Sequence, residues 1–136
     1  MEPYGRLIVV WAVACNRDCM NLDPAESVAY GEGGRQRLVE MAAKFGRLLD
    51  ELPRELHQWD AYVDYLSLLA IAIRDGVFSG RGPATARNLM LCLLGTAGFR
   101  LKTGQAIDGP LLESIDVGDP GEVAALVKAT FDPPPD

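Results

Sequence analysis

The side chains best suited to chemistry in this chain are one histidine and two aspartates near its middle. His57 is the only histidine, and Asp60 and Asp64 follow it one helical turn apart. Two carboxylates on one helical face can bind Mg²⁺ or Ca²⁺, with Glu55 as a third candidate ligand, and histidine is a common general base. Such cation sites recruit further oxygen ligands, however, and no nucleophile stands at a recognisable spacing from His57. We therefore predict no catalytic residue, no metal and no cofactor, and keep a small-ligand or metal-dependent enzyme centred on His57, Asp60 and Asp64 as an alternative.

A glycine-rich loop beside several arginines has the composition of an anion-binding site. The loop, residues 79–82, runs into Pro83, a residue type that favours the first turn of a helix. Exposed backbone donors, the positive end of a helix dipole and arginine side chains bind anionic groups. The chain lacks the lysine-containing pattern of a nucleotide-binding P-loop, and an ordinary turn between two helices is the other interpretation. The residues predicted to bind an anion or a partner are Arg74, Ser79, Gly80, Arg81, Gly82 and Arg87.

Three cysteines bear on metal binding and on the cellular compartment. Cys15 and Cys19 would share a helical face, but a zinc site would need both Cys92 and His57 from distant segments, so we predict small buried residues instead. An odd cysteine count without a disulfide framework is typical of a reducing cytoplasm. Residues 12–15 loosely match a lipoprotein signal, but the leader would be too short and lacks the usual leucine. We therefore predict a cytoplasmic protein without a membrane partner.

The charge of the chain alternates along the sequence. The formal net charge is −6, yet residues 74–107 carry five basic and one acidic side chain, and residues 108–136 carry one basic and seven acidic. This alternation predicts either that one block docks on another or that the blocks form separate solvated faces, because a nucleic-acid surface usually makes a whole domain basic. A shared basic face of Arg74, Arg81, Arg87, Arg100 and Lys102 is the arrangement that would favour nucleic acid.

The segment that must position these residues is residues 59–73, in which twelve of fifteen residues are apolar. Asp60, Asp64 and Ser67 recur at helical spacing, which predicts a buried central helix with one narrow polar strip. Trp59, Tyr62 and Tyr65 cover more than one face of it. Core packing is one role for these aromatic residues, and anchoring of a protein interface is the other.

The remaining pattern predicts an all-α fold: a compact bundle of about five helices around a central buried helical hairpin. Residues 6–20 begin with an apolar run that is rich in β-branched side chains, so a strand is one interpretation. A helix is favoured because no helix-breaking residue follows the run. An aspartate that can cap a helix, followed by proline, predicts a helix start at residues 23 and 119. The pair Thr103-Gly104 suggests a minor β-hairpin near 99–107. The predicted helices are residues 6–20, 23–30, 35–52, 59–73, 83–96 and 120–131, in a single domain of residues 1–131 with a frayed proline-rich tail at 132–136.

One short segment resembles a known family. Residues 69–76, LAIAIRDG, lie downstream of Leu52-Pro53 and resemble the helical small subunit of type III CRISPR effector complexes over less than a fifth of the chain. The resemblance implies a helical subunit of a nucleic-acid-associated complex, although the C-terminal half does not follow it.

Taken together, these patterns favour a non-enzymatic helical protein that acts by binding another protein. Three observations support this interpretation: the chain has many apolar residues for a core, its potentially catalytic residues lack recognisable partners, and its charges are segregated along the sequence. The partner is predicted to be a larger assembly, the target of an acidic inhibitor or immunity-type protein, or a second copy in a homodimer. A nucleic-acid-associated subunit with a basic face is the first alternative.

Overall fold

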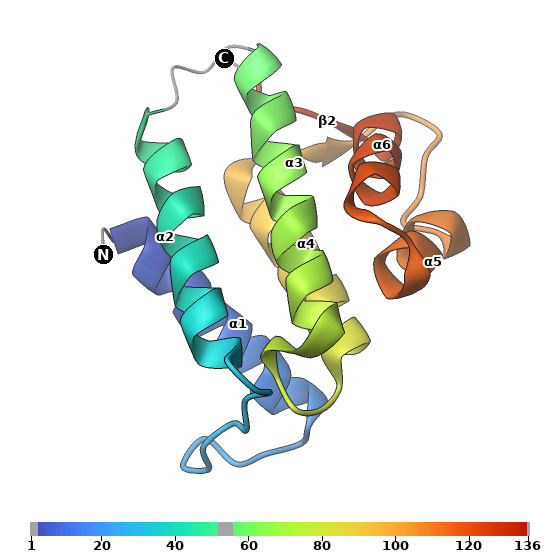
Figure 1. Ribbon diagram of the computed structural model, residues 1–136. Coiled ribbons are helices and arrows are strands. Elements are labelled where there is room, and N and C mark those ends of the chain that lie inside the picture. Colours follow the sequence, from blue (N-terminus) through green and yellow to red (C-terminus); the bar gives the residue numbers. More distant parts are fainter. Residues whose placement is uncertain (1–2, 52–55, 136) are drawn as a thin grey trace.

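The computed structural model describes residues 3–51 and 56–135 and is mainly helical (Figure 1). The described α-helices are α1 (Pro3–Cys19), α2 (Gly34–Glu51), α3 (Leu56–Ala72), α4 (Gly82–Ala97), α5 (Gly109–Val117) and α6 (Pro120–Thr130). A π-helical turn, η1 (Ile73–Val77), extends α3, and two short strands, β1 (Arg100–Leu101) and β2 (Phe131–Asp132), pair with each other. The predicted all-α bundle is confirmed.

The four long helices α1 to α4 enclose the main core. Helix α1 contacts α2 and α4, and α3 contacts the same two neighbours, so the four close into one ring of helices. Helices α5 and α6 form a second layer beside α3 and α4 (Figure 1). The core therefore extends on both sides of α3 and α4, which is why these two helices are apolar around most of their circumference.

The central hairpin of α3 and α4 is largely buried, as predicted. Tyr62, Leu66 and Leu69 of α3 and Leu89 of α4 are almost completely enclosed. The predicted polar strip of α3 is wrong at Ser67, which is fully buried and satisfies its hydroxyl by donating to the carbonyl oxygen of Val63, 2.8 Å away. A small hydroxyl can do this in a helix interior, so its polarity does not force exposure.

The predicted helix at residues 23–30 is not formed. Only a single turn forms at its predicted start, where the backbone amide of Glu26 donates to the carbonyl oxygen of Asp23. Beyond it the chain is extended: Tyr30 forms an antiparallel bridge with Phe78, and the Ser79 amide donates to the carbonyl oxygen of Ala29. The tertiary pairing with residues 77–79 supplies hydrogen bonds that a short isolated helix would otherwise have to make itself, and therefore overrides the local signal.

The C-terminal part folds back over the central hairpin. Helix α5, which the sequence analysis did not predict, and helix α6 lie against α4 and α3 respectively. The predicted minor antiparallel sheet is present, but only β1 lies within residues 99–107: its partner is β2, with Arg100 opposite Asp132 and Leu101 opposite Phe131. The Thr103-Gly104 turn is present without a strand following it.

The end of the last helix bears on the predicted domain boundary. Asp132, expected to open the frayed tail, belongs to β2, whereas residues 133–135 have no regular structure. The assignment of residues 1–131 to a single domain stays a prediction. Within residues 3–51 and 56–135, no helix is long and apolar enough to cross a lipid bilayer.

Candidate functional site

Arg74, predicted to bind an anion, instead binds the end of α5. Its Nη1 donates to the carbonyl oxygens of Ile115, at 3.3 Å, and Gly118, at 2.6 Å. A guanidinium group at a helix C-terminus is stabilised by the unpaired carbonyls and by the helix dipole. Nε also donates to Asp75 at 2.7 Å, and this hydrogen bond lowers the pKa of that carboxyl group. The Arg74 side chain, 13% exposed, is therefore occupied within the chain.

Arg87 makes the second connection to α5. Its Nε donates to Oδ1 of Asp116 at 2.7 Å, and its Nη2 donates to the other carboxylate oxygen. This two-pronged pair raises the pKa of Arg87. Arg74 and Arg87 both come from the basic residues 74–107 and α5 from the acidic residues 108–136, so these contacts join the two blocks. They also remove two of the five cations from the predicted nucleic-acid face.

The glycine-arginine loop is held in place by a buried amide. Nδ2 of Asn16, on α1, donates to the carbonyl oxygen of Gly80 at 2.9 Å and to the Thr85 hydroxyl at 3.1 Å. That hydroxyl in turn donates to the carbonyl oxygen of Arg81 at 2.7 Å. Gly82 touches the preceding turn so closely that a Cβ there would lie 2.5 Å from the Arg74 carbonyl oxygen. The loop is thus a fixed turn between helices. Of the three arginines predicted to bind an anion, only Arg81 has an exposed side chain without an ion pair to the described part of the chain.

The alternative metal or catalytic group is only partly described. Asp64 accepts a hydrogen bond from Lys128 at 3.0 Å, and Asp60 is exposed. Glu55 lies outside the described residues, and the His57 side chain lies outside the described side chains. Across residues 3–51 and 56–135, no three histidine, cysteine or acidic side chains gather closely enough to hold a metal ion.

The three aromatic interface candidates occupy different environments. Tyr62 is 2% exposed, and its hydroxyl donates to the carbonyl oxygen of Leu93 at 3.0 Å. Burial raises the pKa of Tyr62 above its usual range. Trp59 is 8% exposed and lies edge-on to Phe99, with ring centroids 5.4 Å apart. Both residues serve the interior, which corrects their assignment to an interface, and only Tyr65 presents an exposed ring.

The cysteines lie along the contact between α1 and α4. The Cys19 sulfur accepts a hydrogen bond from Asn88 Nδ2 at 3.3 Å. Cys15 is half-buried, and desolvation together with the nearby Cys92 thiol raises its pKa to about 11. All three are free thiols: Cys15 and Cys19, which were predicted to be buried, are partly exposed, and Cys92 is exposed.

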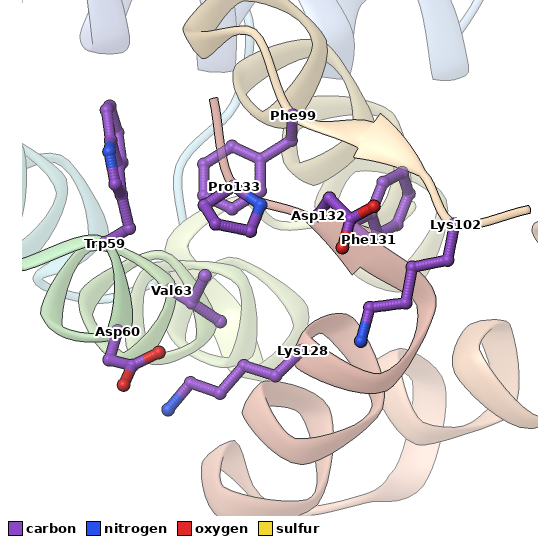
Figure 2. A pocket seen from close by; sticks show the side chains of 9 residues that line it. All are labelled: Trp59, Asp60, Val63, Phe99, Lys102, Lys128, Phe131, Asp132 and Pro133. Atoms are coloured by element: carbon purple, nitrogen blue, oxygen red, sulfur yellow. The ribbon is translucent and has the colours of Figure 1, made fainter. Parts of the chain in front are cut away.

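A pocket of about 320 Å³ opens between α3, β1 and the C-terminal segment (Figure 2). Its apolar lining comes from Trp59, Val63, Phe99, Phe131 and Pro133. Its charged lining comes from Asp60, Lys102, Lys128 and Asp132. Figure 2 shows the Lys128 side chain running toward Asp60, away from Lys102, and Trp59 standing on the side of the pocket opposite Lys102.

One residue that lines the pocket carries an unsatisfied donor. The indole Nε1 of Trp59 is buried and has no hydrogen-bond partner within the described part of the chain. Most buried donors in folded proteins are paired, and an unpaired one carries a desolvation penalty of about 1–3 kcal/mol. The nitrogen has almost no accessible surface, so it is not open to the pocket.

A second unusual surface lies on α1. Its inner face, with Ile8 and Ala12, is buried in the core, while its outer face carries three large apolar side chains at helical spacing. Tyr4, Leu7 and Val10 are 50%, 44% and 59% exposed. We call these three residues, with the exposed Ala14, the α1 outer face.

Sequence reasoning missed Asn16 and most of the pocket. Asn16 directly follows an apolar run, and its two partners are more than sixty residues away, so the local sequence does not indicate its role. The pocket joins residues from α3, β1, α6 and β2, whose approach only the tertiary structure reveals. The α1 outer face had a signal: an apolar run without a polar side.

Comparisons with protein-family models, with curated proteins and with solved structures find no match for this chain.

Proposed function

We propose that this protein acts by binding another protein through the α1 outer face. The observation that supports the proposal is that α1 is apolar on both sides, while the described part of the chain covers only one of them. Single exposed apolar residues are common on protein surfaces, but a contiguous stripe is characteristic of an interaction site. The exposed fractions of Leu7 and Val10 show how much apolar area remains for a partner to cover.

The internal contacts of the charged residues also support a non-enzymatic role. Two of the three arginines that suggested an anion site, Arg74 and Arg87, contact α5, and Asp64 is paired with Lys128. The free thiols are compatible with the cytoplasm, which we include in the proposal. The partner is then a subunit of an assembly, the target of an acidic inhibitor, or a second copy of this chain.

The test is to place a charge on the α1 outer face. We expect Leu7→Glu and Val10→Glu to abolish binding without unfolding the protein, because both side chains are exposed. Complexes purified from the native host by a tag on this chain, with and without each substitution, identify the partner by mass spectrometry. Sedimentation of the purified protein separates self-association from binding of a different protein.

The matched control is Leu68→Glu on α3. Leu68 is 46% exposed, similar to Leu7, but it lies on another helix. A partner lost with Leu7→Glu and retained with Leu68→Glu supports the proposal. A partner retained by both α1 variants, or lost equally with Leu68→Glu, contradicts it.

A further inference from the structure

We propose that Cys15 and Cys92 form a reversible disulfide bond when the protein is exposed to a peroxide, and that this bond joins α1 covalently to α4. The site is separate from the α1 outer face, and neither proposal depends on the other. The inference starts from the placement of the cysteines. Two of the three belong to α1 and the third to α4, and these two helices are in contact.

The packing of α1 against α4 determines which cysteines lie opposite each other. The two helices run in opposite directions, so the last turns of α1 meet the first turns of α4 (Figure 1). There Asn88 of α4 donates to the sulfur of Cys19 at 3.3 Å. Cys15 lies one turn back along α1 from Cys19, and Cys92 lies one turn onward along α4 from Asn88. The antiparallel register therefore places Cys15 beside Cys92.

The electrostatics agree with this pairing. The Cys92 thiol contributes to the raised pKa of Cys15, second to desolvation and ahead of Cys19, although Cys19 is only one turn away on the same helix. A neighbouring charge has such an effect over a short distance. The alternative bond between Cys15 and Cys19 is disfavoured, because both side chains project from one helix in the same direction and a disulfide needs them to converge.

The exposure of the two thiols assigns their roles. Cys92 is exposed, so hydrogen peroxide reaches its sulfur first. The peroxide takes two electrons from this sulfur: an S–O bond forms, the O–O bond breaks, and the thiol proton leaves with the other oxygen as water. The half-buried Cys15 sulfur then attacks the Cys92 sulfur of the sulfenic acid, and the hydroxyl group leaves with the Cys15 proton as a second water.

The bond would change the stability of the protein and not its fold. It connects two helices that are already in contact, and it closes a loop of residues 15–92. A cross-link between residues far apart in the sequence restricts the unfolded chain and so favours the folded state. Disulfides in a reducing compartment are usually transient and respond to oxidants, which fits a bond that forms only on exposure to peroxide.

The experiment maps the bond by mass spectrometry of the full chain. Trypsin cleaves after arginine, so the three cysteines fall in three different peptides, residues 7–17, 18–35 and 88–100. The reduced protein is treated with hydrogen peroxide, alkylated and digested without a reducing agent. We expect residues 7–17 to be linked to residues 88–100 in the monomer, and dithiothreitol to separate them. A predominant link that involves residues 18–35, a link between two copies of residues 88–100, or no link at all overturns the proposal.

Two variants and a stability measurement complete the test. Cys19→Ala should keep the bond, whereas Cys92→Ser, a change at an exposed position, should lose it. The urea midpoint of the wild type should rise on oxidation and return with dithiothreitol. That of Cys92→Ser should not rise, and this variant also controls for oxidation of methionines. Loss of the bond in Cys19→Ala, or a wild-type midpoint that falls relative to oxidised Cys92→Ser, overturns the proposal.

Discussion

Arg87 on α4 and Asp116 on α5 form a two-pronged ion pair, with Nε and Oδ1 2.7 Å apart. The pair joins the basic middle of the chain to its acidic C-terminal part. Together with Arg74, which caps α5, it fixes the short helix that the sequence pattern did not predict. Both side chains remain partly exposed, so the contribution of the pair to stability is modest despite its good geometry.

Replacing Arg87 by methionine should lower the free energy of unfolding by about 1 kcal/mol. Arg87→Lys should recover only part of this loss, because an ammonium group cannot reproduce the paired donors of a guanidinium group. Chemical denaturation of both variants and of Asp116→Asn, combined in a double-mutant cycle, measures the coupling. Additive effects of Arg87→Met and Asp116→Asn would contradict the pair.

Two glycines should respond in opposite directions to alanine. A Cβ on Gly34 would lie 2.0 Å from the Val77 carbonyl oxygen, so the backbones of α2 and η1 must separate. We expect Gly34→Ala to destabilise the protein by about 1–3 kcal/mol, the usual range for overpacking. Gly95, exposed on α4, provides the contrast, because a Cβ added there would meet nothing within 4 Å.

Gly95→Ala should raise the free energy of unfolding by about 0.5–1 kcal/mol, because alanine loses less backbone entropy in a helix. Thermal unfolding of the two variants side by side checks both signs. A neutral Gly34→Ala would mean that the approach of α2 to η1 is looser than the structure describes.

How far the fold follows from the sequence depends on where the deciding contacts lie. Helix α2 begins within a residue of its predicted start, because Leu38, Ala42 and Phe45 recur at helical spacing and all face the core, whereas its predicted last residue, Leu52, lies outside the described residues. Residues 23–30 carried only a helix-start signal and form no helix, because their backbone pairs with residues 77–79 instead. A local sequence pattern therefore predicts an element correctly only where the tertiary contacts support the same structure.

The candidate sites were harder to predict for the same reason. The arginines were identified by composition, but their partner Asp116 lies 29 residues after Arg87, and no spacing rule connects them. Trp59 was identified as an aromatic anchor, yet its role at the pocket depends on Phe99 and Lys102 arriving from another segment. Sequence reasoning located the residues, and the tertiary structure decided what they contact.

Neighbouring leucines on α3 provide a direct test of the buried hairpin. Leu69 is 1% exposed and Leu68 is 46% exposed. Leu69→Ala should cost about 2–5 kcal/mol, because it removes buried methyl groups and leaves a cavity. Leu68→Ala should change the free energy of unfolding by less than about 0.5 kcal/mol. Urea denaturation of the two variants decides this, and equal losses would mean that α3 is oriented differently about its axis.

The raised pKa of Cys15 predicts how stability changes at high pH. Desolvation raises this pKa from 9.0 to about 11, so the folded state retains a proton that the unfolded chain has already released. The contribution to stability is present below about pH 9 and is lost as the pH rises toward 11. Urea midpoints of the wild type and of Cys15→Ala across this interval should show a shallower decline in the variant. Tyr62 is present in both proteins and so cancels in the comparison, and parallel declines would contradict the assignment to Cys15.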